Sequence, residues 1–255
     1  MRSSMMFHKS PKVPSFAGLI FLFLLSPSIA RRRFSQSDQI QDEPAATRTH
    51  GIGSCANDTH IIDTLLMANE STYNKEKVPK SHDMIVVIQV WVQEISSISE
   101  LTQDFEIDLY MNEVWHDPRL RYEALNPCKT NISLDNLMYD KIWTPNTCFI
   151  NSKEASIHES PFRNIFLMIY PNGTLWTNYR VKLTGPCSMN LENFPMDIQE
   201  CSLTFESFNY NIEEVRMEWF RDPPIVILKA NGQIELPDFT LMLCTAKREA
   251  VVSFS

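Results

Sequence analysis

The sequence of 255 residues predicts an all-β fold, a β-sandwich preceded by one short helix. Apolar and polar side chains alternate along residues 105–112 and again along residues 179–183. This alternation is typical of a strand that buries one face and exposes the other to water. The turn Pro171-Asn172-Gly173 separates two apolar runs, as in a β-hairpin. Several short strands joined by such turns predict a sandwich.

The N-terminal residues 1–30 predict a secretory signal peptide. Basic residues precede an apolar run from Phe16 to Leu25, and residues 28–30 have the small-x-small pattern of a cleavage site. The apolar run is too short to span a bilayer. The alternative is a chain that keeps an apolar N-terminus inside the cell.

Two further regions follow the predicted signal. Residues 31–57 are polar and irregular, and they predict a disordered arm. Apolar residues then recur at helical spacing, so we expect a short amphipathic helix over residues 59–68. The rest of the chain alternates strands and turns, and we expect one folded domain over residues 58–255. An all-β domain of this length routinely forms a single unit.

The composition of the chain limits the kinds of partner and of chemistry that can be expected. The chain has 23 basic and 31 acidic residues, a net charge of −8 that argues against a nucleic-acid partner. Its six cysteines, an even number, fit an oxidising compartment. The sequence contains no catalytic signature motif and no cluster with metal-ligand spacing. We therefore expect that the chain is not an enzyme and that it has no metal or cofactor site. Four sequons predict glycosylation in a secreted chain, at Asn57, Asn69, Asn131 and Asn172.

The most informative motif is a short loop between two cysteines. Cys187 and Cys201 enclose 13 residues, and Phe194-Pro195-Met196-Asp197 lies near the far end of the loop. A disulfide across this loop would stabilise the fold by roughly 3 kcal/mol through loop-closure entropy. The bridge of an immunoglobulin domain spans a much longer stretch of sequence. The Phe-Pro pair suggests a rigid, apolar tip that docks on another surface.

This loop resembles the signature of the Cys-loop receptors, the pentameric neurotransmitter-gated ion channels. Further segments similar to that family are residues 115–120, 131–136, 141–147, 205–210 and 234–239. The nearest likeness is to GABA-A receptor subunits of the invertebrate (nematode) type, from the anion-selective branch. The resemblance implies that residues 58–255 are an extracellular ligand-binding domain with the family's immunoglobulin-like, ten-stranded sandwich, from which the tenth strand is missing. It also implies a pentamer with agonist bound between neighbouring subunits.

The resemblance assigns five residues to the agonist site. Glu206, Ser207 and Phe208 fall on the principal-face segment that holds the amine of the agonist, and Tyr210 follows it. Tyr110 falls at the aromatic position of the complementary face. Ring faces hold an ammonium group through cation–π attraction. The alternative for Phe208 and Tyr210 is ordinary strand packing.

Four positions depart from the pattern of a GABA-binding subunit. Cys148 stands where the principal face has a tyrosine, and Asn178 replaces a threonine of the complementary face. Asn112 and Met168 stand where an α-type complementary face has arginines. The resemblance implies a GABA-like small-molecule neurotransmitter, but these positions leave its carboxylate without an arginine partner.

The resemblance also implies roles for the loop and for the other cysteines. Phe194 and Pro195, together with Asp197, would couple agonist binding to the membrane domain, although Asp197 could instead be a plain turn residue. We expect a second disulfide, between Cys128 and Cys148. The two remaining cysteines either pair with one another, cross to a partner chain, or stay free; they are Cys55 and Cys244.

In the family a tenth strand and four membrane helices follow the segment at residues 234–239, and the sequence from there to Ser255 does not contain them. A sandwich without this strand is expected to expose a sheet edge. The resemblance therefore implies the ligand-binding region of a chloride-channel subunit, at the extracellular, postsynaptic face of the plasma membrane in the full-length protein. The alternatives are a secreted, pore-less binding or decoy protein from a shortened transcript, and a non-functional product.

Overall fold

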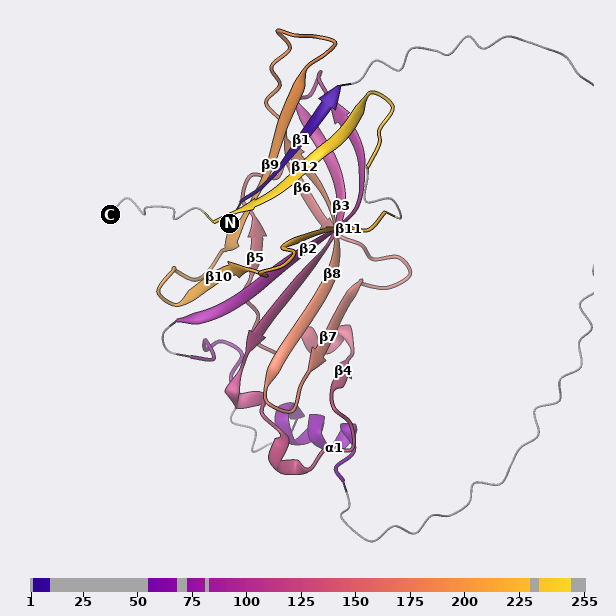
Figure 1. The fold of residues 1–255 in the computed structure, drawn as a ribbon. Coiled ribbons are helices and arrows are strands. Elements are labelled where there is room, and N and C mark those ends of the chain that lie inside the picture. Colours follow the sequence, from indigo (N-terminus) through magenta and orange to yellow (C-terminus); the bar gives the residue numbers. More distant parts are fainter. Residues whose placement is uncertain (1, 10–54, 68–72, 81–82, 230–233, 249–255) are drawn as a thin grey trace, which may run out of the picture. The chain divides into compact units, whose positions relative to one another are not determined.

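The computed structural model describes residues 2–9, 55–67, 73–80, 83–229 and 234–248 (Figure 1). Across these residues the chain forms two β-sheets and a few short helical segments, so the expected all-β sandwich is confirmed. The helical segments are α1 (Asp58–Ile62), η1 (Asp63–Met67), η2 (Pro118–Leu120), η3 (Glu123–Leu125) and α2 (Asn136–Tyr139). Segments α1 and η1 lie where the sequence predicts one short helix.

The smaller sheet has four strands in the order β12-β1-β9-β5. Its strands are β12 (Phe239–Lys247), β1 (Arg2–Lys9), β9 (Ile198–Ser207) and β5 (Thr147–Phe149). Strand β1 runs antiparallel to both neighbours, and β5 pairs with the end of β9. In Figure 1 the indigo β1 lies beside the yellow β12.

The larger sheet has eight strands. Its main order is β10-β2-β3-β8-β7-β4, while β11 pairs with β2 and β6 pairs with β8. The long strands are β2 (Met84–Ser99), β3 (Asp104–His116) and β8 (Thr174–Pro186). The short strands are β4 (Ile132–Leu134), β6 (Glu154–Ile157), β7 (Ile165–Ile169), β10 (Val215–Trp219) and β11 (Ile225–Ile227).

Strands β7 and β8 form the hairpin that the turn at residues 171–173 predicts. Gly173 has a φ of +84°, in the left-handed region that favours glycine. A Cβ at Gly173 would lie 2.4 Å from the carbonyl oxygen of Asp117. The turn therefore requires glycine both for its backbone conformation and for its contact with the end of β3.

Side chains from the two sheets fill the core between them. The alternating apolar residues of β3, from Phe105 to Met111, are buried as their pattern predicts. Phe7 of the smaller sheet packs against Phe105 of the larger sheet, with 6.4 Å between ring centroids. At Gly185 of β8 a Cβ would lie 2.7 Å from Phe105 and 2.8 Å from Leu203, so a larger residue would push the sheets apart.

A buried carboxylate fixes the end of β3. Asp117 is fully buried and accepts hydrogen bonds from Nη2 of Arg119 at 2.7 Å and from the hydroxyl of Tyr73 at 3.1 Å. Arg119 in turn donates to the carbonyl oxygens of Asn74 and Lys77, both at 2.9 Å. This network ties residues 73–77 to η2.

A second buried carboxylate lies inside the larger sheet. Glu113 of β3 accepts hydrogen bonds from the hydroxyl of Tyr179 at 2.8 Å and from that of Thr177 at 3.4 Å. Burial raises the pKa of Glu113 above its ordinary value of 4.5. The hydroxyl donors oppose this shift because they stabilise the ionised carboxylate.

Strand β1 falls in the stretch that the sequence assigns to a signal peptide. Residues 10–30 of that stretch, with the cleavage site, lie outside the described residues. In the described part, Met5 and Phe7 are buried, and β1 occupies an interior position of the smaller sheet between β9 and β12. Removal of residues 1–30 would therefore remove one strand of this arrangement.

The expected disulfide between Cys128 and Cys148 is wrong. Cys128 pairs with Cys55, and Cys148 is free. The backbone explains the pairing, because Ala56 and Pro127 form a parallel bridge that places the two cysteines side by side. Cys148 instead lies on β5, opposite Glu206 of β9.

The start of the domain and its sequons are partly described. Residues 55–57, the end of the predicted disordered arm, are held against residues 126–128 by backbone hydrogen bonds. The remainder of that arm lies outside the described residues, as does the sequon at Asn69. The other three sequon asparagines have exposed or half-exposed side chains, which keeps glycosylation a prediction for Asn57, Asn131 and Asn172.

Candidate functional site

A pocket of about 310 Å³ lies on the larger sheet, on the side facing away from the core. Trp91 and Tyr110 are opposite one another on β2 and β3, and each alternates with buried residues such as Val90 and Leu109. Their side chains therefore point away from the smaller sheet. The residues that line this aromatic pocket are Trp91, Gln93, Tyr110, Phe166, Trp176, Asn178 and Leu228.

Hydrogen bonds and ring contacts hold the lining of the aromatic pocket. Phe166 and Trp176 meet edge to face, with 5.4 Å between ring centroids. Asn112 accepts a hydrogen bond from Nε1 of Trp176 at 3.2 Å and another from Nδ2 of Asn178 at 2.7 Å. One buried amide oxygen thus orients two lining side chains. Met168, opposite Trp176 in the β7–β8 ladder, is not among the lining residues.

The cation that contacts this surface is already paired. The guanidinium of Arg180 lies 5.8 Å from the ring centroid of Tyr110 and makes two bonds to Asp108, at 2.6 and 3.0 Å. The hydrogen bond to Asp108 raises the pKa of Arg180. None of the described residues that line the pocket carries a charge. The pocket therefore presents ring faces and amide groups to a ligand.

A second surface is formed by the segment that the sequence assigns to the principal face. Nε1 of Trp143 donates a hydrogen bond to the hydroxyl of Tyr210 at 2.9 Å, and their ring centroids are 5.6 Å apart. The hydroxyl of Ser207 donates to the carbonyl oxygen of Pro145 at 2.7 Å. The two segments that resemble the family, residues 141–147 and 205–210, are thus fastened side by side.

The side chains of this segment differ in how accessible they are to a ligand. The side chain of Phe208 is 72% exposed, although its backbone N–H donates to the carbonyl oxygen of Asn146 at 3.0 Å. Glu206 is half-buried on β9 and faces Cys148 in the register. Phe208 and Glu206 are therefore available to a ligand, whereas Tyr210 and Ser207 also hold the segment together.

The structure sorts the five predicted ligand residues into two surfaces. Glu206 and Ser207 belong to β9 of the smaller sheet, with Phe208 and Tyr210 directly after it. Tyr110 belongs to the larger sheet and lines the aromatic pocket. Two surfaces on different sheets of one chain fit a site shared between neighbouring subunits.

Sequence reasoning missed five residues that line the aromatic pocket, namely the aromatic residues Trp91, Phe166 and Trp176 together with Gln93 and Leu228. A signal was present for Trp91, because it alternates with the apolar residues Val90 and Val92. Large aromatic side chains on the wet face of a strand form an apolar patch that often marks a binding site. Strands β2, β7 and β8 contribute to one pocket because of their order in the sheet. The alternation within a single strand does not reveal that order.

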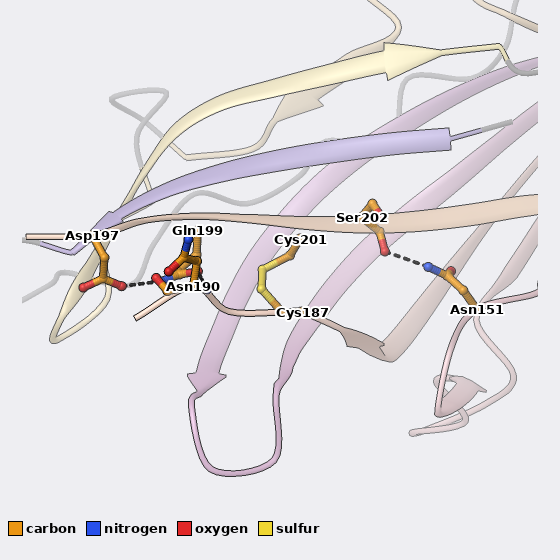
Figure 2. The surroundings of a disulfide bond; sticks show 7 residues. All are labelled: Asn151, Cys187, Asn190, Asp197, Gln199, Cys201 and Ser202. Atoms are coloured by element: carbon orange, nitrogen blue, oxygen red, sulfur yellow. Dashed lines mark hydrogen bonds between the residues drawn. A yellow bond between two sulfur atoms is a disulfide. The ribbon is translucent and has the colours of Figure 1, made fainter. Parts of the chain in front are cut away.

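The loop between Cys187 and Cys201 is closed by the expected disulfide, which is shown in Figure 2. The buried amide of Gln199 donates to the carbonyl oxygen of Asn190 at 2.8 Å and also hydrogen-bonds the carboxylate of Asp197. Oε1 of Gln199 accepts from the backbone N–H of Asn190 at 3.0 Å. Gln199 therefore joins both sides of the loop.

The tip of this loop is apolar and exposed. Phe194 and Met196 are 60% and 56% exposed, whereas Asp197 is buried. Leu191 and Ile198 nearby are 45% and 60% exposed, and exposed apolar side chains that gather in one place often mark a surface that docks on another part of the protein. Asp197 contributes to the shape of the loop through its hydrogen bond with Gln199.

Two further features concern only the residues that the structure describes. In that part of the chain no group of three or more histidine, cysteine or acidic side chains could hold a metal ion. No helix there is both long and apolar enough to cross a membrane.

Comparison with known sequences gives a family. The profile described as neurotransmitter-gated ion-channel ligand binding domain matches residues 58–253. The chain is 61% identical over 191 residues to the acetylcholine-gated chloride channel subunit acc-1 of Caenorhabditis elegans, an alignment that covers 75% of this chain and 40% of the relative. It is 51% identical over 196 residues to the acetylcholine-gated chloride channel subunit acc-2 of the same organism, covering 76% and 43%.

A vertebrate relative is more distant. The gamma-aminobutyric acid receptor subunit theta of Mus musculus is 32% identical over 191 residues, which cover 74% of this chain and 29% of that subunit. The chain thus spans less than half the length of these curated relatives. The family consists of ligand-gated channels, so the expectation that the chain is not an enzyme is confirmed. With its loop, its sandwich and this match, the chain belongs to the neurotransmitter-gated ion-channel ligand-binding domain family.

Proposed function

We propose that this chain is the extracellular, agonist-binding region of a subunit of a pentameric chloride channel that opens to a cationic amine of the acetylcholine class. The observation that carries this proposal is the aromatic pocket, with four rings and no charged lining residue. Each ring face that a desolvated ammonium group contacts contributes about 0.5–2 kcal/mol. The pocket would form the complementary side of the site.

The same chemistry disfavours GABA as the agonist. A carboxylate ligand requires an arginine or a comparable donor. Asn112 and Met168 occupy the positions where the resemblance implies arginines, and Arg180 is engaged by Asp108. Relatives at 61% and 51% identity are named as acetylcholine-gated chloride channel subunits, which supports both the cationic agonist and chloride as the permeant ion.

The principal side of the site would come from the neighbouring subunit. Its exposed Phe208 adds a further ring, and Glu206 adds a negative charge that attracts the ammonium group. A carboxylate beside an aromatic ring favours a cation through both charge and ring quadrupole. Cys148 stands where a GABA-binding subunit has a tyrosine, so this side has one ring fewer and the rings of the complementary pocket would supply more of the cation binding.

The exposed tip of the disulfide loop would couple the site to the pore. Phe194 and Pro195 would dock on the membrane part of the subunit, while Asp197 sets the shape of the loop. The domain would then lie at the extracellular face of the plasma membrane, as in a channel subunit. The relatives are named as channel or receptor subunits, and they give no support to a secreted, pore-less binding protein.

A chimeric channel tests the proposal. Residues 58–239 of this chain replace the equivalent stretch of the acc-1 subunit, and currents are recorded in response to acetylcholine, serotonin and GABA. We expect acetylcholine to open the chimera at the lowest concentration. Activation by GABA without activation by acetylcholine would contradict the proposal. Tyr110→Ala should raise the half-activating concentration about tenfold, and the ring-retaining Tyr110→Phe should not.

A further inference from the structure

An ion pair borders the aromatic pocket on the outer face of the larger sheet. Arg180 of β8 lies opposite Tyr110 of β3 in the register, and Tyr110 lines the pocket. The guanidinium of Arg180 is 5.8 Å from the ring centroid of Tyr110 while it donates two hydrogen bonds to the carboxylate of Asp108. Because an arginine keeps its proton at every ordinary pH, a permanent positive charge lies beside one ring of the pocket.

Asp108 holds this guanidinium in place. Nη2 of Arg180 is 2.6 Å from one carboxylate oxygen of Asp108, and Nε is 3.0 Å from the other. A bidentate pair of this kind fixes the direction of a guanidinium as well as balancing its charge. The same carboxylate lies 3.1 Å from Nε2 of His158, so it is contacted from a second side. Asp108 is two residues from Tyr110 on β3, and the pairing therefore draws the guanidinium along the strand toward Asp108.

A neighbouring ion pair on the same face lies farther from the pocket and is more open to solvent. Glu106, two residues before Asp108 on β3, pairs with Lys182 of β8 at 3.3 Å. Their side chains are 38% and 53% exposed, against 19% and 32% for Asp108 and Arg180. Along β8, Asn178 lines the pocket, Arg180 is the next residue on that face, and Lys182 follows it. Since water and salt screen exposed charges more strongly, the charge of Arg180 acts on the pocket more than that of Lys182 does.

We propose that Asp108 determines which charge class of ligand the aromatic pocket accepts. With Asp108 in place the charge of Arg180 is balanced, and the rings favour an ammonium ligand that carries no carboxylate. Without Asp108 the guanidinium of Arg180 repels an ammonium group and offers a bidentate partner to a carboxylate. Asp108 acts through Arg180 and is therefore a positioning residue. This inference rests on the proposed function, because it concerns the same agonist site.

Charged thiol reagents test the inference in the full chain without any channel opening. Gln93 lines the pocket, so Gln93→Cys places a thiol there, and the free Cys148 and Cys244 are replaced by serine. Mass spectrometry at one fixed pH follows modification by two methanethiosulfonates, one with a quaternary ammonium group and one with a sulfonate. We expect Asp108→Asn to lower the ratio of the cation rate to the anion rate about tenfold. The matched control Glu106→Gln should change this ratio by about twofold or less.

Further variants separate an effect of charge from damage to the fold. Asp108→Glu keeps the charge and should keep the native ratio, whereas Arg180→Gln should raise the ratio. Asp108→Asn combined with Arg180→Gln removes both charges and should return the ratio close to the native value. The inference is overturned if Asp108→Asn behaves like Glu106→Gln, or if the double variant keeps the lowered ratio. Should Asp108→Asn fail to fold, an unchanged ratio in Arg180→Gln overturns it instead.

Currents in the chimeric channel connect this charge to the agonist. Asp108→Asn should raise the half-activating concentration of acetylcholine about tenfold and strengthen the response to GABA, and the added Arg180→Gln should reverse both changes. In a native chimera that responds to acetylcholine, an unchanged response of Asp108→Asn overturns the inference. A native chimera that does not respond to acetylcholine contradicts the proposed function, and the ratio of thiol modification rates then still decides the role of Asp108.

Discussion

The indole nitrogen of Trp143 donates a hydrogen bond to the hydroxyl of Tyr210, with 2.9 Å between Nε1 and the oxygen. Trp143 is 1% exposed, so its N–H has little access to water. This one bond connects two segments that lie far apart in the sequence and that together form the principal-side surface. Its loss should therefore affect both the stability of the domain and the shape of that surface.

Tyr210→Phe should lower the free energy of unfolding by about 1–3 kcal/mol, because the buried indole N–H loses its partner. Urea denaturation measures the change. Phe208→Ala is the control, since the ring of Phe208 is 72% exposed and its removal should change stability by about 0.5 kcal/mol or less. An equal loss in both variants would show that Phe208 is a packing residue rather than a ligand contact.

Asp117→Ala should destabilise the domain by about 3–5 kcal/mol, because it leaves the partly buried Arg119 without its counter-charge and frees residues 73–77. Thermal or urea denaturation provides the measurement. Asp140→Ala is the matched control, since Asp140 is 68% exposed and pairs with Arg163 at 3.6 Å. An exposed pair of this kind contributes about 0–1 kcal/mol. Similar losses in the two variants would contradict the role given to Asp117.

Glu113→Gln should change the pH dependence of stability. The folded carboxyl has a raised pKa, so the unfolded chain releases its proton first as the pH rises above 4.5, and the folded state loses stability until its own carboxyl ionises. The variant lacks this loss and keeps an acceptor for Tyr179. Its advantage in unfolding free energy over the native chain should therefore grow from pH 4 to neutral pH. Parallel stability curves would contradict the burial of an ionisable group here.

Cys55→Ser and Cys128→Ser should each lower the free energy of unfolding by about 4 kcal/mol, since their disulfide spans a sequence separation of 73 residues. The double variant should lose no more than either single one. Peptide mapping under oxidising conditions should recover the Cys55–Cys128 peptide and an alkylated Cys148. Recovery of a Cys128–Cys148 peptide would refute the observed pairing.

Local sequence patterns predict those parts of the fold that are set by interactions between residues close in sequence. The alternation in residues 105–112 and 179–183 predicts strands β3 and β8. The turn at residues 171–173 predicts the hairpin between β7 and β8. The short spacing of Cys187 and Cys201 makes their disulfide the natural pairing. Each of these features is set by residues that are close in sequence.

Features that depend on long-range register could not be predicted in this way. The partner of Cys128 follows from a bridge between Ala56 and Pro127, and sequence alone does not determine disulfide connectivity. The aromatic pocket requires the order of β2, β3, β8 and β7, which brings Trp91 and Trp176 to one surface. The pairing of residues 2–9 with β9 and β12 joins segments from opposite ends of the sequence, which local patterns do not reveal.

Binding of a cation by the aromatic pocket is tested by a series of fluorinated tryptophans at Trp176 and, separately, at Trp91 in the chimeric channel. Fluorine withdraws electron density from the ring face and so weakens its attraction for a cation without changing the shape of the side chain greatly. The half-activating concentration of acetylcholine should rise stepwise with the number of fluorines at one or both positions. Unchanged activation across both series would contradict a cation held by this aromatic pocket.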